Sequence, residues 1–318
     1  MTDITAFLKR HRMPLLLAAG FLCCLGTWLF GWLDSYLQLV LMYMGVNIIL
    51  TLSLNLVNGY MGEFSVGHAA FMSIGAYTAS LITVKVFPCG GQAGFTAAVI
   101  CGGAAAGLAG LLVAFPSFKT RGDYLAIVTL ALNIIVKSAI ENIDAAGGPR
   151  GFMGMSAMTN LPWVFFWTAL AVWIMRNFIY SSGGRGAMAI REDETAAELM
   201  GVNTRQVKIR VFVLSAFFAG VAGALFAHIL RYISPGTFDI LKSTEILAMV
   251  YLGGIGSIAG SIAGAVLYTG LLEALRFMGV WRMAVMPLIL VGLMLFRRRG
   301  IFGLREFSWF VPRSEGKP

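Results

Sequence analysis

Ten apolar stretches, most of them close to 20 residues long, follow one another along this chain with only short polar turns between them. A helix needs about 20 mostly apolar residues to cross the hydrocarbon core of a bilayer. The stretches cover residues 14–33, 36–57, 58–86, 93–115, 124–141, 163–179, 211–232, 240–254, 257–275 and 285–296. This pattern predicts an all-α, polytopic membrane protein with about ten transmembrane helices, some of them short and broken by glycine.

Composition supports a membrane protein with a single integral domain. Hydrophobic residues make up 58% of the 318 residues and charged residues only 12%, about half the charged share of a soluble domain. No polar block is long enough for a second, soluble domain, so we expect one integral domain over residues 1–318. The net charge of +9 is not gathered on a basic, aromatic face. The charge therefore does not indicate a nucleic-acid partner. It indicates a chain embedded in a bilayer.

The basic residues predict the orientation. Short loops rich in Lys and Arg stay on the cytoplasmic side, which places the basic N-terminus, the charged segment 183–210 and Arg297–Arg299 there. Six crossings precede the charged segment, and four follow it if residues 240–254 and 257–275 cross separately. The first apolar run is too long for a typical signal peptide. We expect an uncleaved, multi-pass protein with both termini in the cytoplasm.

Glycine-rich interruptions occur in both halves of the chain, at residues 59–67 and 253–264. With five crossings in each half, any internal repeat would be inverted. Paired broken helices in inverted repeats are typical of the substrate pathway of transporters. The pattern therefore predicts a possible inverted repeat with a central pathway near the two interruptions.

The segment 183–210 is the longest polar interval in the chain, and its middle is rich in helix formers. We expect a short amphipathic helix from Arg191 to Gly201, ended by Gly201 or Asn203 in a left-handed conformation. The alternative is an ordinary solvated loop.

The order Thr195-Ala196-Ala197, three residues, then Gly201 resembles the EAA-x-x-x-G coupling loop of ABC importer permeases. Thr195 stands where that pattern has Glu, and Glu194 or Glu198 can take over its role. The flanking REDE and GVN resemble the LivM-type branched-chain amino-acid permease family. Four other stretches are similar to the same family: GEFSVGH, GDYLAIVTLALN, GGPRGF and GGIGSIAGSIAGA.

The resemblance implies the permease subunit of an ATP-driven importer in a bacterial inner membrane, with no cofactor or metal of its own. It implies four kinds of partner: the lipid bilayer, a second related permease, two cytoplasmic ATPase subunits, and a periplasmic binding protein that delivers branched-chain or related hydrophobic amino acids. Within the cytoplasmic coupling loop, about residues 183–207, it assigns ATPase coupling to Arg191, Glu192, Asp193, Glu194, Ala196, Ala197 and Gly201.

No enzyme motif is present in the sequence. It has no GxxxxGK[ST] phosphate loop, no serine elbow and no HExxH, so we expect a transport subunit whose ATP is hydrolysed by a partner. Two alternatives stay open. One is a permease of the same class for another small solute, such as urea or a sugar. The other is an ion-coupled transporter, in which Glu63 and Glu245 carry the ion.

Polar residues inside apolar spans are candidates for the pathway, because they are costly there. The candidates for the translocation pathway or gate are Glu63, Ser65, His68, Thr129, Asn133 and Glu245. Five of them have a structural alternative. Glu63 can cap the following helix, and His68 can be a hydrogen-bonded packing residue. Thr129 and Asn133, four apart on one helical face, can bond to a neighbouring helix, and Glu245 can be merely interfacial.

Overall fold

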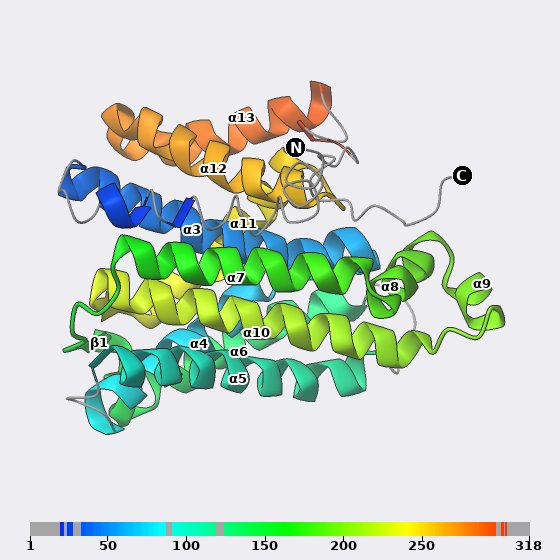
Figure 1. Cartoon of the computed structure of the whole chain (residues 1–318), viewed down its shortest axis with the longest axis horizontal. Helices are drawn as coiled ribbons and strands as arrows, with labels where there is room; N and C mark the ends of the chain where they lie inside the picture. Colours follow the sequence, from blue (N-terminus) through cyan, green and yellow to red (C-terminus); the bar gives the residue numbers. More distant parts are fainter. Residues whose placement is uncertain are drawn as a thin grey trace, which may run out of the picture.

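The long helices of the chain lie side by side in one bundle, and two short helices project from one end of it (Figure 1). The computed structural model describes residues 20–21, 24–27, 33–86, 91–118, 124–296, 300–301 and 303. Its longer helices are α3 (Ser35–Asn55), α4 (His68–Leu81), α5 (Gly91–Ser117), α6 (Tyr124–Glu141), α7 (Leu161–Tyr180), α10 (Thr204–Leu230), α11 (Ile240–Gly253), α12 (Ile258–Ala274) and α13 (Arg282–Phe296). The projecting pair is α8 (Ser182–Glu192) and α9 (Glu194–Leu199), and we call their end of the bundle the charged end.

The described part of the chain contains seven helices that are long and apolar enough to cross a membrane: Ser35–Met61, His68–Val86, Gly91–Ser117, Tyr124–Glu141, Leu161–Tyr180, Thr204–Leu230 and Ile258–Gly279. An all-α, polytopic membrane protein is therefore confirmed, whereas the count of ten is not. Two of the expected crossings correspond to α11 and α13, which have only 14 and 15 residues. The first expected crossing, residues 14–33, lies mostly outside the described residues.

Helix α10 occupies the centre of the bundle and packs against α3, α4 and α5. Small residues allow this close approach. A Cβ added at Gly75 of α4 would overlap the backbone of Gly220 on α10, and one added at Gly223 would overlap the backbone of Met72. Between apolar helices in a bilayer, such backbone contacts supply van der Waals packing that larger residues would prevent. These glycines fix how α4 and α10 cross.

Gly75→Ala is therefore expected to lower the melting temperature of the detergent-solubilised protein by several degrees. Overpacking costs about 1–3 kcal/mol, and each kcal/mol lowers Tm by roughly 2–4 °C in a chain of about 150–250 residues and by somewhat less in a longer one. The matched control is Gly107→Ala on α5, because a Cβ there meets its first neighbour at 3.6 Å, an ordinary contact distance. Equal melting temperatures for the two variants in a thermal-shift assay would contradict this account of the packing.

The opposite end of the bundle carries the one strand pair of the described residues. β1 (Phe152–Met153) is antiparallel to β2 (Tyr232–Ile233), with Phe152 opposite Ile233. The preceding turn is the GGPRGF stretch. Gly151 has φ 84°, and a Cβ there would collide with the Ile233 carbonyl. The loop between α6 and α7 is thereby fastened to the end of α10.

Candidate functional site

Helices α8 and α9 at the charged end are separated by a break at Asp193. Asp193 has an extended backbone, and its side chain accepts a hydrogen bond from the Ala196 amide at 3.0 Å. It ends α8 and serves as the N-cap of α9. The prediction of one continuous helix from Arg191 to Gly201 is therefore wrong at this residue. Helix α8 begins earlier than expected, with Ser181 as its N-cap.

Helix α9 is the outermost element of the charged end (Figure 1). Gly201 follows it with φ 85° and donates its amide hydrogen to Glu198 O at 2.9 Å. This left-handed turn is the end that the sequence predicts. Ala197 faces inward and is buried, whereas the side chains of Leu199 and Met200 are 84% and 85% exposed. An apolar tip therefore projects from an otherwise polar segment.

A buried lysine joins α9 to the segment between α3 and α4. The ammonium of Lys208, one turn into α10, lies 2.6 Å from Glu63 Oε1 and 2.8 Å from Glu194 Oε1. Its side chain is only 9% exposed. Glu63 therefore faces the charged end. It does not cap α4, whose N-cap is Gly67 and whose Ala69 amide is bound by Ser243 Oγ of α11 instead.

Arg191 makes a second contact with the same segment. Its Nη1 donates to Gly59 O at 3.1 Å, and its Nη2 forms an ion pair with Glu192 at 2.7 Å. Gly62, with φ 82°, lies directly against the Arg191 side chain. Arg191 and Glu194, predicted for coupling, and Glu63, predicted for a gate, are thus brought to the same segment: Glu63 and Glu194 share the Lys208 ammonium, and Arg191 binds Gly59.

The two glycine-rich interruptions of the sequence meet in space. Asn55, at the end of α3, donates to Ser257 O and Ser261 Oγ and accepts from the Gly256 amide, all within 3.0 Å. A Cβ at Gly59 would overlap Asn55 and the backbone nitrogen of Gly256. We call this contact between residues 55–59 and 256–261 the glycine junction. Backbone away from regular helix needs such partners at membrane depth.

Ser65, Thr129 and Asn133 lie beside the first interruption. Thr129 Oγ1 on α6 accepts a hydrogen bond from the Val66 amide at 3.2 Å, and Asn133 is buried one turn further along the same helix. Among the described residues, Ser65 Oγ and Asn133 Oδ1 are buried without a hydrogen-bond partner. Thr129 thus holds the interruption in place, whereas Ser65 Oγ and Asn133 Oδ1 can each form a further hydrogen bond.

His68, the first residue of α4, is buried between α3 and α10. Its Nε2 lies 3.0 Å from Ser215 Oγ, which itself donates to Ser53 O at 2.5 Å. Because the hydroxyl hydrogen is used on Ser53, His68 Nε2 carries the hydrogen of the first contact. His68 connects three helices, as a packing residue does, and no second titratable group of the described part of the chain is hydrogen-bonded to it.

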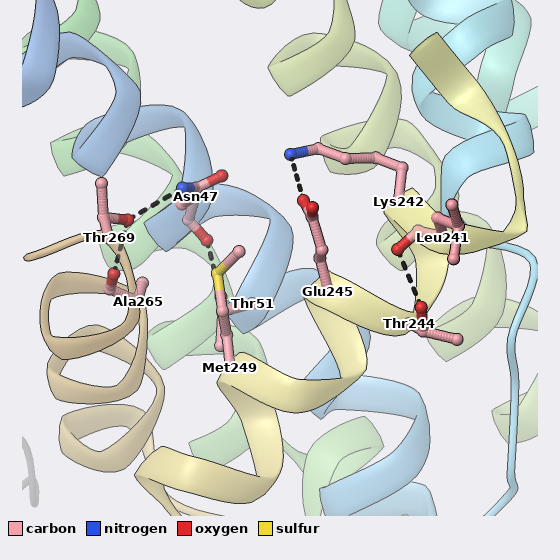
Figure 2. A network of polar contacts seen from close by, with 9 residues as sticks. All are labelled: Asn47, Thr51, Leu241, Lys242, Thr244, Glu245, Met249, Ala265 and Thr269. Carbon is pink, nitrogen blue, oxygen red and sulfur yellow. Dashed lines mark hydrogen bonds and ion pairs between the residues drawn. The ribbon is translucent and has the colours of Figure 1, made fainter. Parts of the chain in front are cut away.

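Glu245 lies apart from the Lys208 cluster, on α11. Figure 2 shows it pointing toward Lys242, at 2.9 Å, with Asn47 of α3 reaching Thr269 of α12 nearby at 2.9 Å. At the start of α11, Asp239 accepts from the Ile240 amide and pairs with Lys137 of α6. The amide hydrogen bond and then the Lys137 ammonium hold the pKa of Asp239 below its ordinary value.

Sequence reasoning missed two residues that organise this region. Lys208 was counted with the basic residues that set orientation, although it stands one turn into α10 and is nearly buried. Asn55 was read as part of an apolar run. A polar side chain just before a glycine-rich interruption is the signal that could have singled out Asn55.

Comparison with known proteins identifies similar permeases. The family model for the permease component of branched-chain amino acid transport systems matches residues 36–296. The chain is 32% identical over 291 residues to the high-affinity branched-chain amino acid transport system permease protein LivM of Escherichia coli (strain K12), which covers 80% of this chain and 67% of that relative. It is 26% identical over 251 residues to the LivH permease protein of the same organism, over 71% of this chain and 80% of LivH.

Proposed function

Because the chain belongs to the family of branched-chain amino acid transport permeases, we propose that it is the membrane-spanning subunit of an ATP-driven ABC importer. Its cargo is branched-chain or closely related hydrophobic amino acids, delivered by a periplasmic binding protein. The family consists of transport permeases and not of enzymes, so the energy comes from two separate ATPase subunits. The similarity to both LivM and LivH supports pairing with a second, related permease.

The observation that carries this proposal is the construction of α9. Its apolar tip, Leu199 and Met200, is presented by a helix fixed at both ends, by the Asp193 cap and the Gly201 turn. A short helix with an exposed apolar side fits a groove on a partner protein. Beside it, a groove of about 490 Å³ between α8 and α10 has two arginines, Arg185 and Arg210, among otherwise uncharged lining residues. We infer that this face receives the ATPase.

The same proposal sets the orientation. Residues 1–318 form one integral domain in a bacterial inner membrane, with segment 183–207 and both termini on the cytoplasmic side. The bundle end that carries β1 and β2 then faces the periplasm, where the binding protein docks. The bias of Lys and Arg toward the charged segment supports this direction.

An ion-coupled transporter has less support from the geometry. Such a transporter needs a carboxylate that is free to take up and release its ion. Glu63 and Glu245 are each paired with a lysine, at 2.6 Å and 2.9 Å. Both carboxylates are already neutralised by a fixed cation, which leaves the ATP-driven importer as the better supported class.

Replacing Leu199 and Met200 together by glutamate is expected to remove the ATPase from the complex, since it puts charge where an apolar contact is required. The test is a mild-detergent pull-down from the native membrane, with the co-purifying proteins identified, and uptake of labelled leucine, isoleucine and valine. The unaltered chain should bring down an ATPase and a second permease, and the double variant only the permease. Asn177→Asp, at an exposed site near the end of α7 and outside that groove, controls for added charge. An unaltered chain that purifies without any ATPase would refute the proposed function.

A further inference from the structure

We propose that Lys208 is the positioning residue that transmits movement of α8 and α9 to the glycine junction. This inference rests on the proposed function, because it assumes that a partner ATPase moves α9. It adds the residue through which that movement enters the membrane part of the chain, and the place where it arrives.

Lys208 is the only side chain that holds Glu63 and Glu194 together within the described residues. Both carboxylates contact one ammonium, and no other cation among the residues that the structure describes is paired with either of them. Glu194 is the first residue of α9, and Glu63 belongs to the irregular segment that follows α3. Without the ammonium, two like charges would face each other and push α9 away from that segment.

The position of Lys208 suits a mechanical role better than a stabilising one. Its side chain is 9% exposed, against 22% for Glu63 and 45% for Glu194. Burying a lysine costs desolvation energy, which its ion pairs offset only when the geometry is good, so a buried ion pair is weak evidence for stability. The Phe118 ring, 5.9 Å from the ammonium, restricts its position further. The cluster therefore specifies one arrangement of α9, α10 and the segment between α3 and α4.

A second contact makes the connection rigid. Arg191, near the end of α8, donates to Gly59 O, four residues before Glu63. Helices α8 and α9 are thus connected to both sides of the turn at Gly62, which has a left-handed backbone. If α8 and α9 move, the turn at Gly62 must move with them, because this turn is held at Gly59 and at Glu63.

The turn is in direct contact with the second interruption. Gly59 lies against Asn55 and the Gly256 amide with no room for a side chain, and Asn55 binds Ser257 and Ser261 at the start of α12. The residues bound by α8 and α9 are therefore connected to the break between α11 and α12 through a single tightly packed contact. Close-packed contacts of this kind transmit a displacement directly, because they are barely compressible.

The test measures substrate taken up per ATP hydrolysed in proteoliposomes that contain the full complex. Lys208→Met is expected to lower this ratio about tenfold, within the range of typical coupling effects, while the ATPase remains bound. Lys208→Arg, which keeps the charge, should recover most of the ratio. Arg276→Met removes a cation from an exposed ion pair with Glu273 and should leave the ratio unchanged. A protein that merely needs Lys208 to fold would lose assembled complex and keep the ratio.

Glu63→Gln provides a second route if the Lys208 variant does not assemble, because it leaves Lys208 paired with Glu194. It should lower the same ratio, and combining it with Lys208→Met should add little, since both changes cut one connection. Normal ratios in Lys208→Met and Glu63→Gln, or losses that multiply in the double variant, would overturn the role of Lys208. Failure of the proposed function looks different: the unaltered complex would then show no ATP-dependent uptake at all.

Discussion

Gly201→Pro is expected to abolish amino acid uptake while the chain still inserts into the membrane. Gly201 has φ 85°, and the proline ring holds φ near −65°. The substitution also removes the amide hydrogen that bonds to Glu198 O. Together these changes cost about 3 kcal/mol or more and rebuild the end of α9, so that its apolar tip points elsewhere. Uptake of labelled leucine and membrane levels of the chain are the two measurements.

The matched control is Gly201→Asn, because asparagine tolerates the left-handed conformation at small cost. It should retain most of the uptake. Ala197→Arg, one turn earlier, should fail like the proline variant, since Ala197 is buried and the arginine would lift α9 from its support. Normal uptake in Gly201→Pro would show that α9 is not the coupling element.

Asn55→Leu should have a comparable effect at the other end of the proposed connection. Leucine keeps the branching of asparagine but leaves the Gly256 amide without its partner and removes the bonds to Ser257 and Ser261. We expect a loss of about 3 kcal/mol of stability, by the usual cost of orphaned buried groups, and near-complete loss of uptake. A thermal-shift assay and the uptake assay together separate the two effects.

Asn47→Leu is the control for that prediction. Asn47 lies on the same helix and is also buried, but its amide makes a single bond, to Thr269 Oγ1. The Asn47→Leu substitution should lower the stability by about 1 kcal/mol and leave uptake largely intact. If the two leucine variants behave alike, the glycine junction has no special role.

The spans were predictable because their determinants are local. Length and apolar composition alone predict a helix over residues 124–141, and α6 has those bounds. The ion pair of Glu273 with Arg276 is local in the same way, because the two residues are three apart in the sequence. The division of α8 from α9 was missed because helix propensity was weighed and the capping signal of Asp193, three residues before Ala196, was not.

The site was predictable only in pieces. Glu63 and the segment around Arg191 were both singled out, as gate and as coupling element, but their proximity depends on a lysine 145 residues beyond Glu63. No local pattern encodes a contact between such distant residues. The roles of Ser65, His68, Thr129, Asn133 and Glu245 in a pathway remain predictions, as does the inverted repeat.

The glycine junction also has a consequence for biosynthesis. Asn55 finds its partner amide on Gly256 only after 201 further residues have been added. At synthesis rates of roughly 5–20 residues per second, the end of α3 waits on the order of ten seconds or more with its polar groups unmatched. During that time it must stay near water or be shielded by a membrane chaperone. The last third of the chain therefore completes the first helices, and truncated forms of this protein should be recognised and degraded as unfinished.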